Sequence, residues 1–516
     1  MKRAKILWAD DEIDLLKPYI LFLSEKGFEV VKVNNGRDAI ELCSTQSFDI
    51  VFMDEHMPGI SGLDAVSEIS KQNPDIPIVM ITKSEDEGIM EQAIGRKIAD
   101  YLIKPVNPHQ ILLAIKKILD QKEIISEKSL KNYRDEFGKL NDDINNCSTP
   151  DGWIDIYKRI SAWDLSLDSF GNDAMVEILQ MQKTDANTAF AKFVRSNYGD
   201  WFNPQISDKP LMSHNLFAEK VYPLLDSGEK VFFILVDNFR FDQWMAIKPL
   251  LTDFYQTTET LYYSILPTAT QYARNAIFGG KTPLDISRTY PKLWKFEDDD
   301  LGKNLSEDEL LTLQIREQGR GDKMSYRKIN SNIEGERLLS EFASLEDNDL
   351  NVVVFNFIDI LSHARNEQKM LQELVPNEAA YRSLTYAWFR HSPLLELMRK
   401  VAQKGYKVIF TTDHGTIRIK NPLKVIADKH INSNLRYKVG RNLTFDSRKV
   451  FDVSEPEKVG LPSQNLSSRY IFALNDSFFA YPNNYNNYIS TYENSFQHGG
   501  VSLEEMIVPF VELTPK

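Results

Sequence analysis

The strongest constraint on the fold is a regular alternation of short apolar runs with amphipathic segments between Lys5 and Leu119. Five runs of strand length, the first of them AKILWAD, alternate with five segments of helical periodicity. Parallel strands need long crossover connections, usually helices, and the amphipathic segments supply them. The pattern therefore predicts an α/β domain with a doubly wound parallel sheet over residues 1–120.

The rest of the chain divides into a helical region and a second α/β domain. Residues 121–203 carry no strand pattern, and their apolar residues recur at spacings of three and four, which predicts a helical bundle that serves as a linker. Strand signals return at VFFILVDN, NVVVFNFID and YKVIFTTDHG, so residues 204–516 should form a larger α/β domain. Within it, residues 281–349 are charged and contain glycine. We expect an insertion over the sheet edge there, either a solvated excursion or a lid that contacts substrate.

Composition restricts the class of protein further. The 516 residues suffice for about three domains, and the apolar stretches are far shorter than the ~18 residues that a membrane span requires. The N-terminal sequence does not resemble a secretory signal. The two cysteines, Cys43 and Cys147, lack the CxxC spacing of thiolate zinc sites, and a disulfide scaffold is excluded. We expect a cytoplasmic protein that does not bind a membrane.

The charge balance opposes nucleic-acid binding over the whole surface. The formal net charge is −13, whereas nonspecific affinity for phosphates comes mainly from clustered Lys and Arg. No basic recognition helix is found, so DNA binding in the usual manner is disfavoured, although a local basic cleft remains open.

Carboxylates gather at the strand ends of the first predicted domain. Asp10 and Asp11 follow the first strand and Asp54 the third, where open α/β sheets place their ligand sites. A hard cation such as Mg²⁺ would relieve the cost of crowding these charges. Thr82 and Lys104 end the fourth and fifth strands with a hydroxyl and an ammonium group, which suit a phosphoryl group.

This set of residues resembles the response-regulator receiver domain, a flavodoxin-like fold. The resemblance implies that Asp54 is the phosphoacceptor, that Lys104 contacts the phosphoryl group, and that Thr82 and Tyr101 form the switch pair. It also implies a Mg²⁺ site made by Asp10, Asp11, Asp54 and the backbone carbonyl of His56. The alternative is a degenerate receiver that only dimerises.

Strand ends of the second α/β domain bring together carboxylates and histidines. Asp237, Asp359 and the Asp413–His414 pair follow three different predicted strands. His363 lies four residues after Asp359, a spacing that places both side chains on one face of a helical turn. Imidazole and carboxylate donors without thiolates favour Zn²⁺, with Mn²⁺ as the alternative.

Thr270 is a candidate nucleophile. It precedes a helical segment, where free backbone N–H groups can face an anion. Its hydroxyl needs a metal to lower its pKa, and three aspartates with one alkoxide carry four negative charges, which two divalent cations would cancel. Arg274, four residues later, could face a phosphate from the next helical turn or form a plain salt bridge.

These residues resemble the alkaline phosphatase superfamily, specifically its PglZ branch. The resemblance implies two metal ions, one held by Asp237, Thr270, Asp413 and His414 and the other by Asp359, His363 and His498. Threonine at position 270 cannot be converted to formylglycine as in sulfatases, and it is the nucleophile of the phosphodiesterase relatives. Phosphomonoesterase or phosphoglycerate-mutase-like activity is disfavoured because those relatives commonly use serine.

The order of receiver, helical linker and PglZ domain resembles the PorX type of response regulator. The resemblance implies a sensor histidine kinase as phosphodonor, a homodimer on phosphorylation, and a link to type IX secretion. We expect a di-metal phosphodiesterase acting on nucleotides or oligonucleotides, in which Thr270 forms a covalent phosphothreonine. The rival hypothesis is a non-catalytic regulator with a structural metal site, which acts by binding DNA or a sigma factor or other transcription factor.

Overall fold

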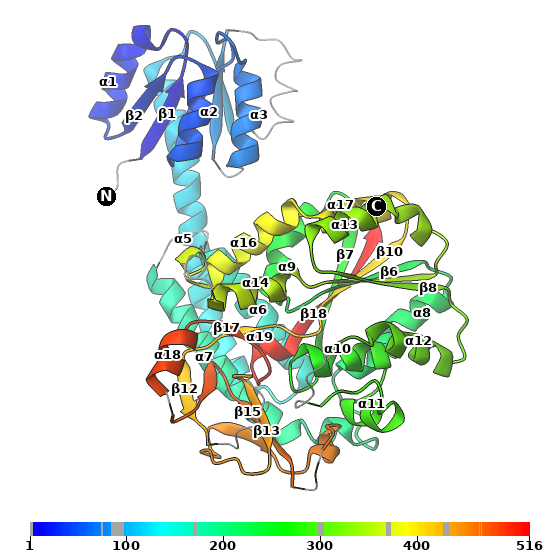
Figure 1. Cartoon of the computed structure of the whole chain (residues 1–516). Helices are drawn as coiled ribbons and strands as arrows, with labels where there is room; N and C mark the ends of the chain where they lie inside the picture. Colours follow the sequence, from blue (N-terminus) through cyan, green and yellow to red (C-terminus); the bar gives the residue numbers. More distant parts are fainter. Residues whose placement is uncertain are drawn as a thin grey trace. The chain divides into compact units, whose positions relative to one another are not determined.

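The computed structural model divides the chain into two compact units, residues 1–132 and 133–516 (Figure 1). It describes residues 4–73, 76–83, 98–168, 173–296, 304–367, 373–426, 434–463, 465, 467–483 and 485–516. Side chains are not described at 120–132, 134, 168, 173–174 and 363–367. None of the described helices is both long and apolar enough to cross a membrane.

The first unit contains a five-stranded parallel sheet, as the sequence predicts. The strand order is β2-β1-β3-β4-β5, and every pairing is parallel. The strands are β1 (Lys5–Ala9), β2 (Glu29–Val33), β3 (Ile50–Asp54), β4 (Ile78–Thr82) and β5 (Asp100–Ile103). The helical elements are η1 (Ile13–Leu16), α1 (Lys17–Glu25), α2 (Gly36–Thr45), α3 (Gly62–Gln72) and α5 (Pro108–Asn146). The fourth predicted helix falls at residues 84–97, outside the described residues.

Local signals explain where two of these helices begin. The side chain of Asn35 accepts a hydrogen bond from the backbone N–H of Asp38 and caps α2. Ser61 caps α3 in the same way through the N–H of Asp64. Such caps satisfy N–H groups that lack a partner in the first helical turn. Buried apolar clusters cover both faces of the sheet, as expected for a doubly wound fold.

The predicted helical region is helical in the structure. It comprises the C-terminal part of α5 followed by α6 (Pro150–Asp168) and α7 (Asp173–Asn197). Trp153 of α6 and Phe190 of α7 are buried, and they belong to the same apolar core as the strands of the following sheet. This region therefore packs directly onto the sheet that forms the centre of the second unit.

A six-stranded mixed sheet forms the centre of the second unit, in the order β7-β18-β10-β6-β9-β8. Its strands are β6 (Val231–Val236), β7 (Tyr255–Tyr263), β8 (Met324–Ile329), β9 (Leu350–Phe355), β10 (Lys407–Thr411) and β18 (Ile507–Pro515). The neighbours β10, β6, β9 and β8 are parallel, whereas β18 is antiparallel to both β10 and β7. The carboxyl ends of β10, β6 and β9 therefore meet at one edge.

The segment 281–349, which the sequence predicts as an insertion over the sheet edge, contributes a strand to the sheet. Its β8 pairs in parallel with β9 and is the edge strand. The segment also contains α11 (Pro283–Thr289), α12 (Glu307–Glu317) and α13 (Asn332–Ser340). This part of the chain is built into the architecture of the sheet.

Helices flank the six-stranded sheet, and smaller sheets lie beside it (Figure 1). The remaining helices are α8 (Tyr222–Asp226), α9 (Phe241–Ile247), α10 (Thr270–Gly279), α14 (Phe357–Glu367), α16 (Glu378–Arg390), α17 (Pro393–Gln403), α18 (Tyr485–Tyr492) and α19 (Leu503–Met506). Short helical turns are η2 (Asp200–Phe202), η3 (Ser213–Asn215), η4 (Phe217–Val221), η5 (Lys248–Leu250), η6 (Phe342–Leu345) and η7 (Pro456–Val459). The smaller sheets pair β11 (Ile417–Arg418) with β17 (Phe496–Gln497), β12 (Asn421–Lys424) with β16 (Ser477–Ala480), and β13 (Tyr437–Gly440) and β14 (Val450–Val453) with β15 (Arg469–Ala473).

Candidate functional sites

The first site is an acidic cluster at the carboxyl edge of the five-stranded sheet. Asp10 follows β1 and Asp54 ends β3, and these strands are neighbours. Both side chains are buried, whereas Asp11 is exposed. Ligand oxygens of the three residues lie within 4.8 Å of one another. Lys104, which follows β5, places its Nζ 2.9 Å from Oδ2 of Asp10 and 2.9 Å from Oδ2 of Asp54.

Burial and the ion pairs of Lys104 shift the pKa values of this cluster in opposite directions. Burial raises the pKa of Asp54, and the hydrogen bond and charge of Lys104 oppose that shift only in part. Burial acts to lower the pKa of Lys104, but its bonds to Asp10 and Asp54 outweigh burial and raise it. The single positive charge of Lys104 thus faces the two buried carboxylates of Asp10 and Asp54, and the carboxylate of Asp11 lies nearby. A divalent cation with oxygen ligands fits the remaining charge, and Mg²⁺ is such a cation.

The predicted switch residues lie beside this cluster on adjacent strands. Thr82 ends β4 fully buried, and its hydroxyl donates a hydrogen bond to the carboxylate of Glu55. Tyr101 lies in β5, paired with Met80 of β4. His56 is exposed at the rim. Sequence reasoning missed Glu55, although its place directly after the phosphoacceptor candidate was a signal.

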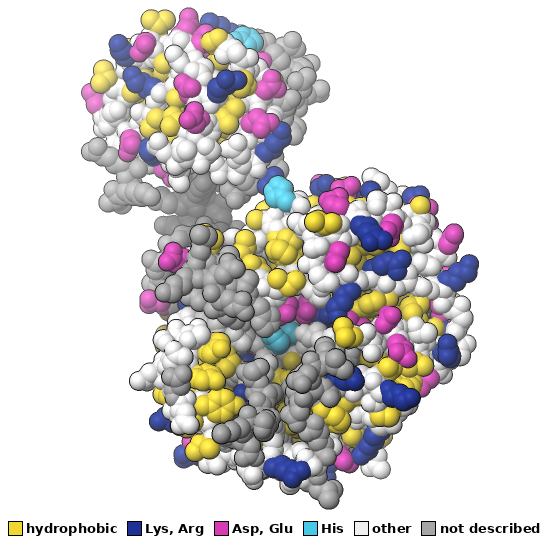
Figure 2. Space-filling view, viewed as in Figure 1, with side chains coloured by type: hydrophobic (Ala, Val, Ile, Leu, Met, Phe, Trp, Pro, Cys, Tyr) yellow, Lys and Arg dark blue, Asp and Glu magenta, His cyan; other side chains and the backbone are white. Residues whose placement is uncertain are grey.

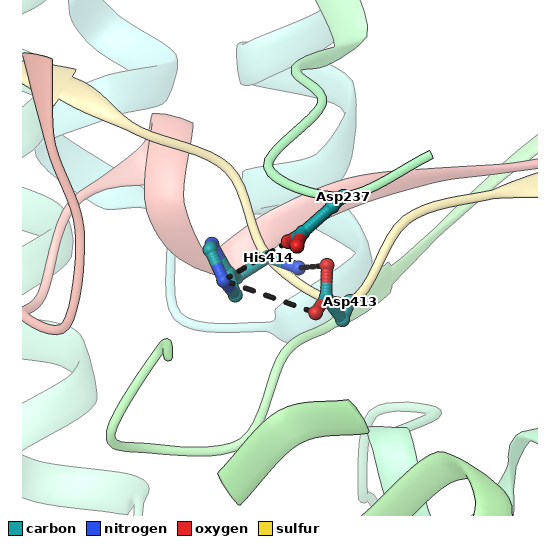
Figure 3. A group of neighbouring side chains, drawn as sticks. All are labelled: Asp237, Asp413 and His414. Carbon is teal, nitrogen blue, oxygen red and sulfur yellow. Dashed lines mark hydrogen bonds and ion pairs between the residues drawn. The ribbon is translucent and has the colours of Figure 1, made fainter. Parts of the chain in front are cut away.

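The second site lies at the carboxyl edge of the six-stranded sheet. Asp237 follows β6, and Asp413 and His414 follow the neighbouring β10. Nε2 of His414 lies 3.8 Å from Oδ1 of Asp237 and 3.8 Å from Oδ2 of Asp413 (Figure 3). Thr270 is the first residue of α10, and its Oγ1 is 3.2 Å from the same Nε2. Four donor side chains from three separate segments of the sequence therefore converge on one small volume.

Hydrogen bonds fix the orientation of the two histidines at this site. Nδ1 of His414 lies 3.1 Å from the carbonyl oxygen of Gly415, and Nδ1 of His498 lies 3.1 Å from that of Thr268. If each Nδ1 carries the proton and donates it, the lone pair of each Nε2 is directed into the site. The two rings are stacked with centroids 4.2 Å apart.

A second group of donors lies on the β9 side of the site. Asp359 lies in the first turn of α14 rather than at the end of β9, and its Oδ1 is 3.7 Å from Nε2 of His498. Nδ2 of Asn238 donates to the same Oδ1 at 3.3 Å. His363 lies one helical turn beyond Asp359 in α14, and its side chain is outside the described part of the structure.

Asn238 is a site residue that sequence reasoning missed. Its backbone has a φ of 60°, in the left-handed region that asparagine tolerates better than most residues. The left-handed conformation of Asn238 turns the chain at the end of β6. Asp237 then lies in the site, and the side-chain amide of Asn238 donates to Asp359. The Asp-Asn pair at a strand end was the available signal.

Arg274 lies among the carboxylates of the site and is 1% exposed. Its Nη2 is 2.5 Å from Oδ2 of Asp237, and its Nε donates to Oδ2 of Asp413 at 3.0 Å. Its Nη1 contacts Glu307 of α12 at 3.4 Å and Asn356 at 3.2 Å. The guanidinium group therefore holds two candidate metal ligands in place, and the segment 281–349 supplies the carboxylate behind it.

The two carboxylates that share Arg274 differ in pKa. Burial raises the pKa of Asp237, and the nearby charge of Asp413 adds to that shift although Arg274 opposes it. Burial also acts to raise the pKa of Asp413, but Arg274 and His414 outweigh it and bring the value to about 2. Asp413 thus stays ionised, whereas Asp237 holds a proton more readily. A cation bound at Asp237 would displace that proton.

Geometry and chemistry of the donors fit a metal ion. Oδ1 of Asp237 is buried without a hydrogen-bond partner among the described residues. In a tetrahedral zinc site with ligands about 2.0–2.3 Å from the ion, neighbouring ligand atoms lie about 3.3–3.8 Å apart. The separations of 3.2 and 3.8 Å around Nε2 of His414 are close to that range.

A third acidic cluster, which the sequence did not reveal, is already neutralised by cations. Asp164 of α6, Asp242 of α9 and Glu378 of α16 lie together. The cations that pair with them are Arg240, Lys183 and Arg382. Because these cations hold the carboxylates, this cluster is an ion-pair network between the helical region and the sheet domain.

Comparisons with known proteins assign each part of the chain. A family described as "BREX system PglZ alkaline phosphatase-like domain" matches residues 216–513. A family described as "PorX response regulator linker domain" matches residues 123–202, and the response regulator receiver domain matches residues 6–116.

Curated relatives resemble the N-terminal part of the chain. A probable transcriptional regulator, ycf27 of Cyanidium caldarium, is 32% identical over 156 residues, which are 30% of this chain and 58% of the relative. The alginate biosynthesis transcriptional regulatory protein AlgB of Pseudomonas syringae pv. tomato is 31% identical over 122 residues, 24% of this chain and 27% of the relative. This chain therefore spans at most about 58% of the length of these two relatives.

Solved structures resemble the same part. A response regulator receiver domain protein from Clostridium thermocellum is 29% identical and covers 24% of this chain and 98% of its own, with a TM-score of 0.23. The chemotaxis response regulator CheY4 of Vibrio cholerae is 26% identical and covers 23% of this chain and 99% of its own, with a TM-score of 0.22.

The fold and the family matches define a class of protein, a response regulator whose receiver is joined to an alkaline phosphatase-like domain. The PglZ match covers more than half of the chain, and the chain belongs to the PglZ family, in the receiver, linker and PglZ arrangement of the PorX type.

Proposed function

We propose that this protein is a metal-dependent phosphodiesterase controlled by phosphorylation of Asp54. A sensor histidine kinase would donate the phosphoryl group, and nucleotides or short oligonucleotides would be the substrates. One observation carries the proposal. Thr270 is the first residue of α10, and its hydroxyl is 3.2 Å from Nε2 of His414. The buried carboxylates of Asp237 and Asp413 lie beside the same histidine. A hydroxyl among metal-ligating side chains is the arrangement that a phosphoryl-transfer nucleophile requires.

The donor sets suggest which ions the two sites would hold. We assign Zn²⁺, or Mn²⁺ in its place, to two positions in the PglZ domain, formed by Asp237, Thr270, Asp413 and His414 and by Asp359, His363 and His498. We assign Mg²⁺ to Asp10, Asp11, Asp54 and the backbone carbonyl of His56. Bound zinc would lower the pKa of the Thr270 hydroxyl and polarise the phosphoryl oxygens.

Residues of the chain would then carry the transfer. The hydroxyl of Thr270 would give its proton to a water molecule and attack phosphorus, the bond to the leaving oxygen would break, and that oxygen would take up a proton from water. The adduct on Thr270 would keep the other ester group of the substrate. A second water would attack its phosphorus, the bond to Oγ1 would break, and Oγ1 would take up the proton that this water releases, which regenerates Thr270. Among the first N–H groups of α10, that of Tyr272 donates to the carbonyl oxygen of Ala269. Those of Thr270 and Gln271 precede the regular helical hydrogen bonds, and the helix has no side-chain cap, so these two can face the phosphoryl oxygens. Arg274 keeps Asp237 and Asp413 in position.

The regulatory role rests on the arrangement of the domains. The match to a PorX linker supports a link to type IX secretion, a homodimer on phosphorylation, and a sigma factor or other transcription factor as a further partner. The continuous helix α5 carries the chain from the receiver into the helical region, and α6 and α7 pack on the core of the sheet domain. A conformational change in the receiver could therefore be transmitted through α5, α6 and α7 toward the Thr270 site.

The substitution Thr270→Val tests the proposed chemistry because it removes the hydroxyl and nearly preserves the volume of the side chain. Hydrolysis of a chromogenic phosphodiester should fall by at least ~100-fold, about 2.7 kcal/mol of barrier. The matched control Thr270→Ser keeps a hydroxyl and should retain measurable activity. A Thr270→Val protein that keeps its metal and hydrolyses the diester at the parent rate would exclude Thr270 as the nucleophile.

A further inference from the structure

A groove with aromatic and cationic walls lies on the second unit, where α7 meets the small sheet of β12 and β16. Two cavities form it, one of about 450 Å³ and one of about 260 Å³. Leu423 and Lys449 line both cavities, so the two are adjacent. We call this feature the α7–β12 groove. None of the metal-donor candidates lines it, so it is separate from the Thr270 site.

The larger cavity provides flat apolar surfaces beside a cation. Phe479 is buried there, and Phe445 and Tyr485 are half-buried. Nζ of Lys424 lies 4.9 Å from the centroid of the Tyr485 ring. Hydrophobic side chains gather at the surface around α18 and β12 (Figure 2). Aromatic faces of this kind stack against nucleobases with little preference for sequence.

The smaller cavity is cationic. Thr188, Lys192 and Arg195 lie on one face of α7, and Arg448 and Lys449 come from the loop before β14. No carboxylate lines this cavity in the part of the chain that the structure describes. Arg448 pairs with Asp446, which lines the larger cavity, whereas neither Lys192 nor Lys449 has an ion pair with a described carboxylate. Positive charge is thus concentrated here on a chain with a net charge of −13.

We propose that the α7–β12 groove binds a short single-stranded oligonucleotide. One base would stack in the larger cavity against Tyr485 and Phe445, and the adjoining phosphates would contact Lys192 and Lys449 in the smaller one. A ligand that alternates planar apolar rings with phosphates matches the order of the two cavities. This binding does not rest on hydrolysis at Thr270.

Binding can be measured with the full chain and a fluorescein-labelled tetrathymidylate whose phosphorothioate linkages resist hydrolysis. The double variant Lys192→Gln with Lys449→Gln should raise the Kd about tenfold or more. It should also reduce the slope of log K against log salt by about 1.4, since each phosphate contact contributes about 0.7. The double variant Lys192→Arg with Lys449→Arg should bind like the parent.

A matched control removes the same charge elsewhere. Lys400→Gln with Lys404→Gln on α17 should change the Kd by less than about twofold, because these lysines lie outside the groove. Equal thermal unfolding midpoints of all variants would show that the losses do not come from unfolding. The Lys192 and Lys449 glutamine variant should hydrolyse a small chromogenic phosphodiester at the parent rate, which separates a failure of the groove from a failure of the proposed catalysis.

The proposed stacking in the larger cavity is tested with an abasic tetramer, which has the same phosphates as the thymidine probe but no bases. The parent should bind the thymidine probe at least ~5-fold more tightly than the abasic one, and Tyr485→Leu should remove most of that difference. Unchanged affinity in the Lys192 and Lys449 glutamine variant would overturn the proposal. Equal binding of the abasic probe, or equally effective competition by inorganic phosphate or a phosphoserine peptide, would overturn it as well.

Discussion

The receiver site and the Thr270 site use the same construction with different donors. Both place carboxylates at the carboxyl ends of neighbouring parallel strands, and both hold two of them with one basic side chain. In the receiver, Lys104 lies 2.9 Å from both Asp10 and Asp54. In the PglZ domain, Arg274 lies between Asp237 and Asp413. A parallel sheet edge thus gathers negative charge in both units, and a built-in cation offsets part of that charge.

The difference lies in the donors and in access to water. The receiver offers oxygen donors only, and Asp11 is exposed, which suits a hard ion that keeps several water ligands. The PglZ site adds two oriented imidazoles, and Asp413 and His414 are fully buried, which suits zinc and a drier reaction centre. The comparison teaches that the same kind of sheet edge can hold a set of oxygen donors alone or a set completed by imidazoles and a hydroxyl.

The largest expected effect is the loss of phosphorylation in Asp54→Ala. Among the described carboxylates of the receiver, only Asp10 and Asp54 lie at a strand end and contact Lys104. The resemblance assigns Asp10 to the metal, which leaves Asp54 as the phosphoacceptor. Labelling by acetyl phosphate, measured by intact-protein mass spectrometry, should disappear. Asp14→Ala, which changes an exposed aspartate in η1, should label like the parent. Undiminished labelling of Asp54→Ala would break the receiver half of the comparison.

His498→Ala should have the next largest effect because it removes an imidazole donor near Asp359. Zinc content should fall toward one ion per chain, and phosphodiester hydrolysis should fall by at least ~100-fold, about 2.7 kcal/mol of barrier. His391→Ala, which changes an exposed histidine of the same unit, is the control. Full metal content and full activity in His498→Ala would remove this residue from the site.

Phosphorylation should double the mass of the particle in solution. A phosphoryl group on Asp54 adds negative charge beside Thr82 and Lys104. It favours the dimer if it stabilises the dimeric state of the protein more than the monomeric state. Sedimentation velocity with and without acetyl phosphate measures the change, and Asp54→Ala should stay monomeric. A constant mass over a wide range of protein concentration would mean that the signal travels without dimer formation.

A smaller effect concerns a histidine away from the site. His214 stacks against Phe202, and burial lowers its pKa to about 4. Between about pH 6.5 and 4 the unfolded chain therefore binds a proton that the folded chain does not, so stability falls as pH falls through this window. From pH 7.5 to 5.5 this residue should cost about 1.4 kcal/mol of unfolding free energy.

Denaturant unfolding of the parent and of His214→Phe at both pH values measures this cost. The variant keeps an aromatic ring and should lack that share of the pH dependence. The same dependence in both proteins would show that His214 does not carry it. His391→Gln, at an exposed position, serves as the control.

The strand-end carboxylates could be predicted from the sequence because apolar runs mark strands and parallel strands end at one edge. The partners of those carboxylates could not. Arg274 and Asp413 are 139 positions apart, and only the folded sheet brings them to 3.0 Å. The strand β8 was missed because most of its residues are only partly buried at the sheet edge, so MSYRKI has no continuous apolar run. Asn238 was missed although its neighbour Asp237 was found.

The central claim, that Thr270 attacks phosphorus, is tested most directly by trapping the covalent intermediate. The parent protein, treated with acetyl phosphate, would be mixed with an excess of phosphodiester, quenched in acid within the first turnovers, and digested for peptide mass spectrometry, which distinguishes the peptide of Thr270 from that of Asp54. We predict a phosphoryl or phosphodiester adduct on Thr270, absent from Thr270→Val. Sustained turnover with no adduct at any quench time, together with undiminished hydrolysis by Thr270→Val, would contradict the account.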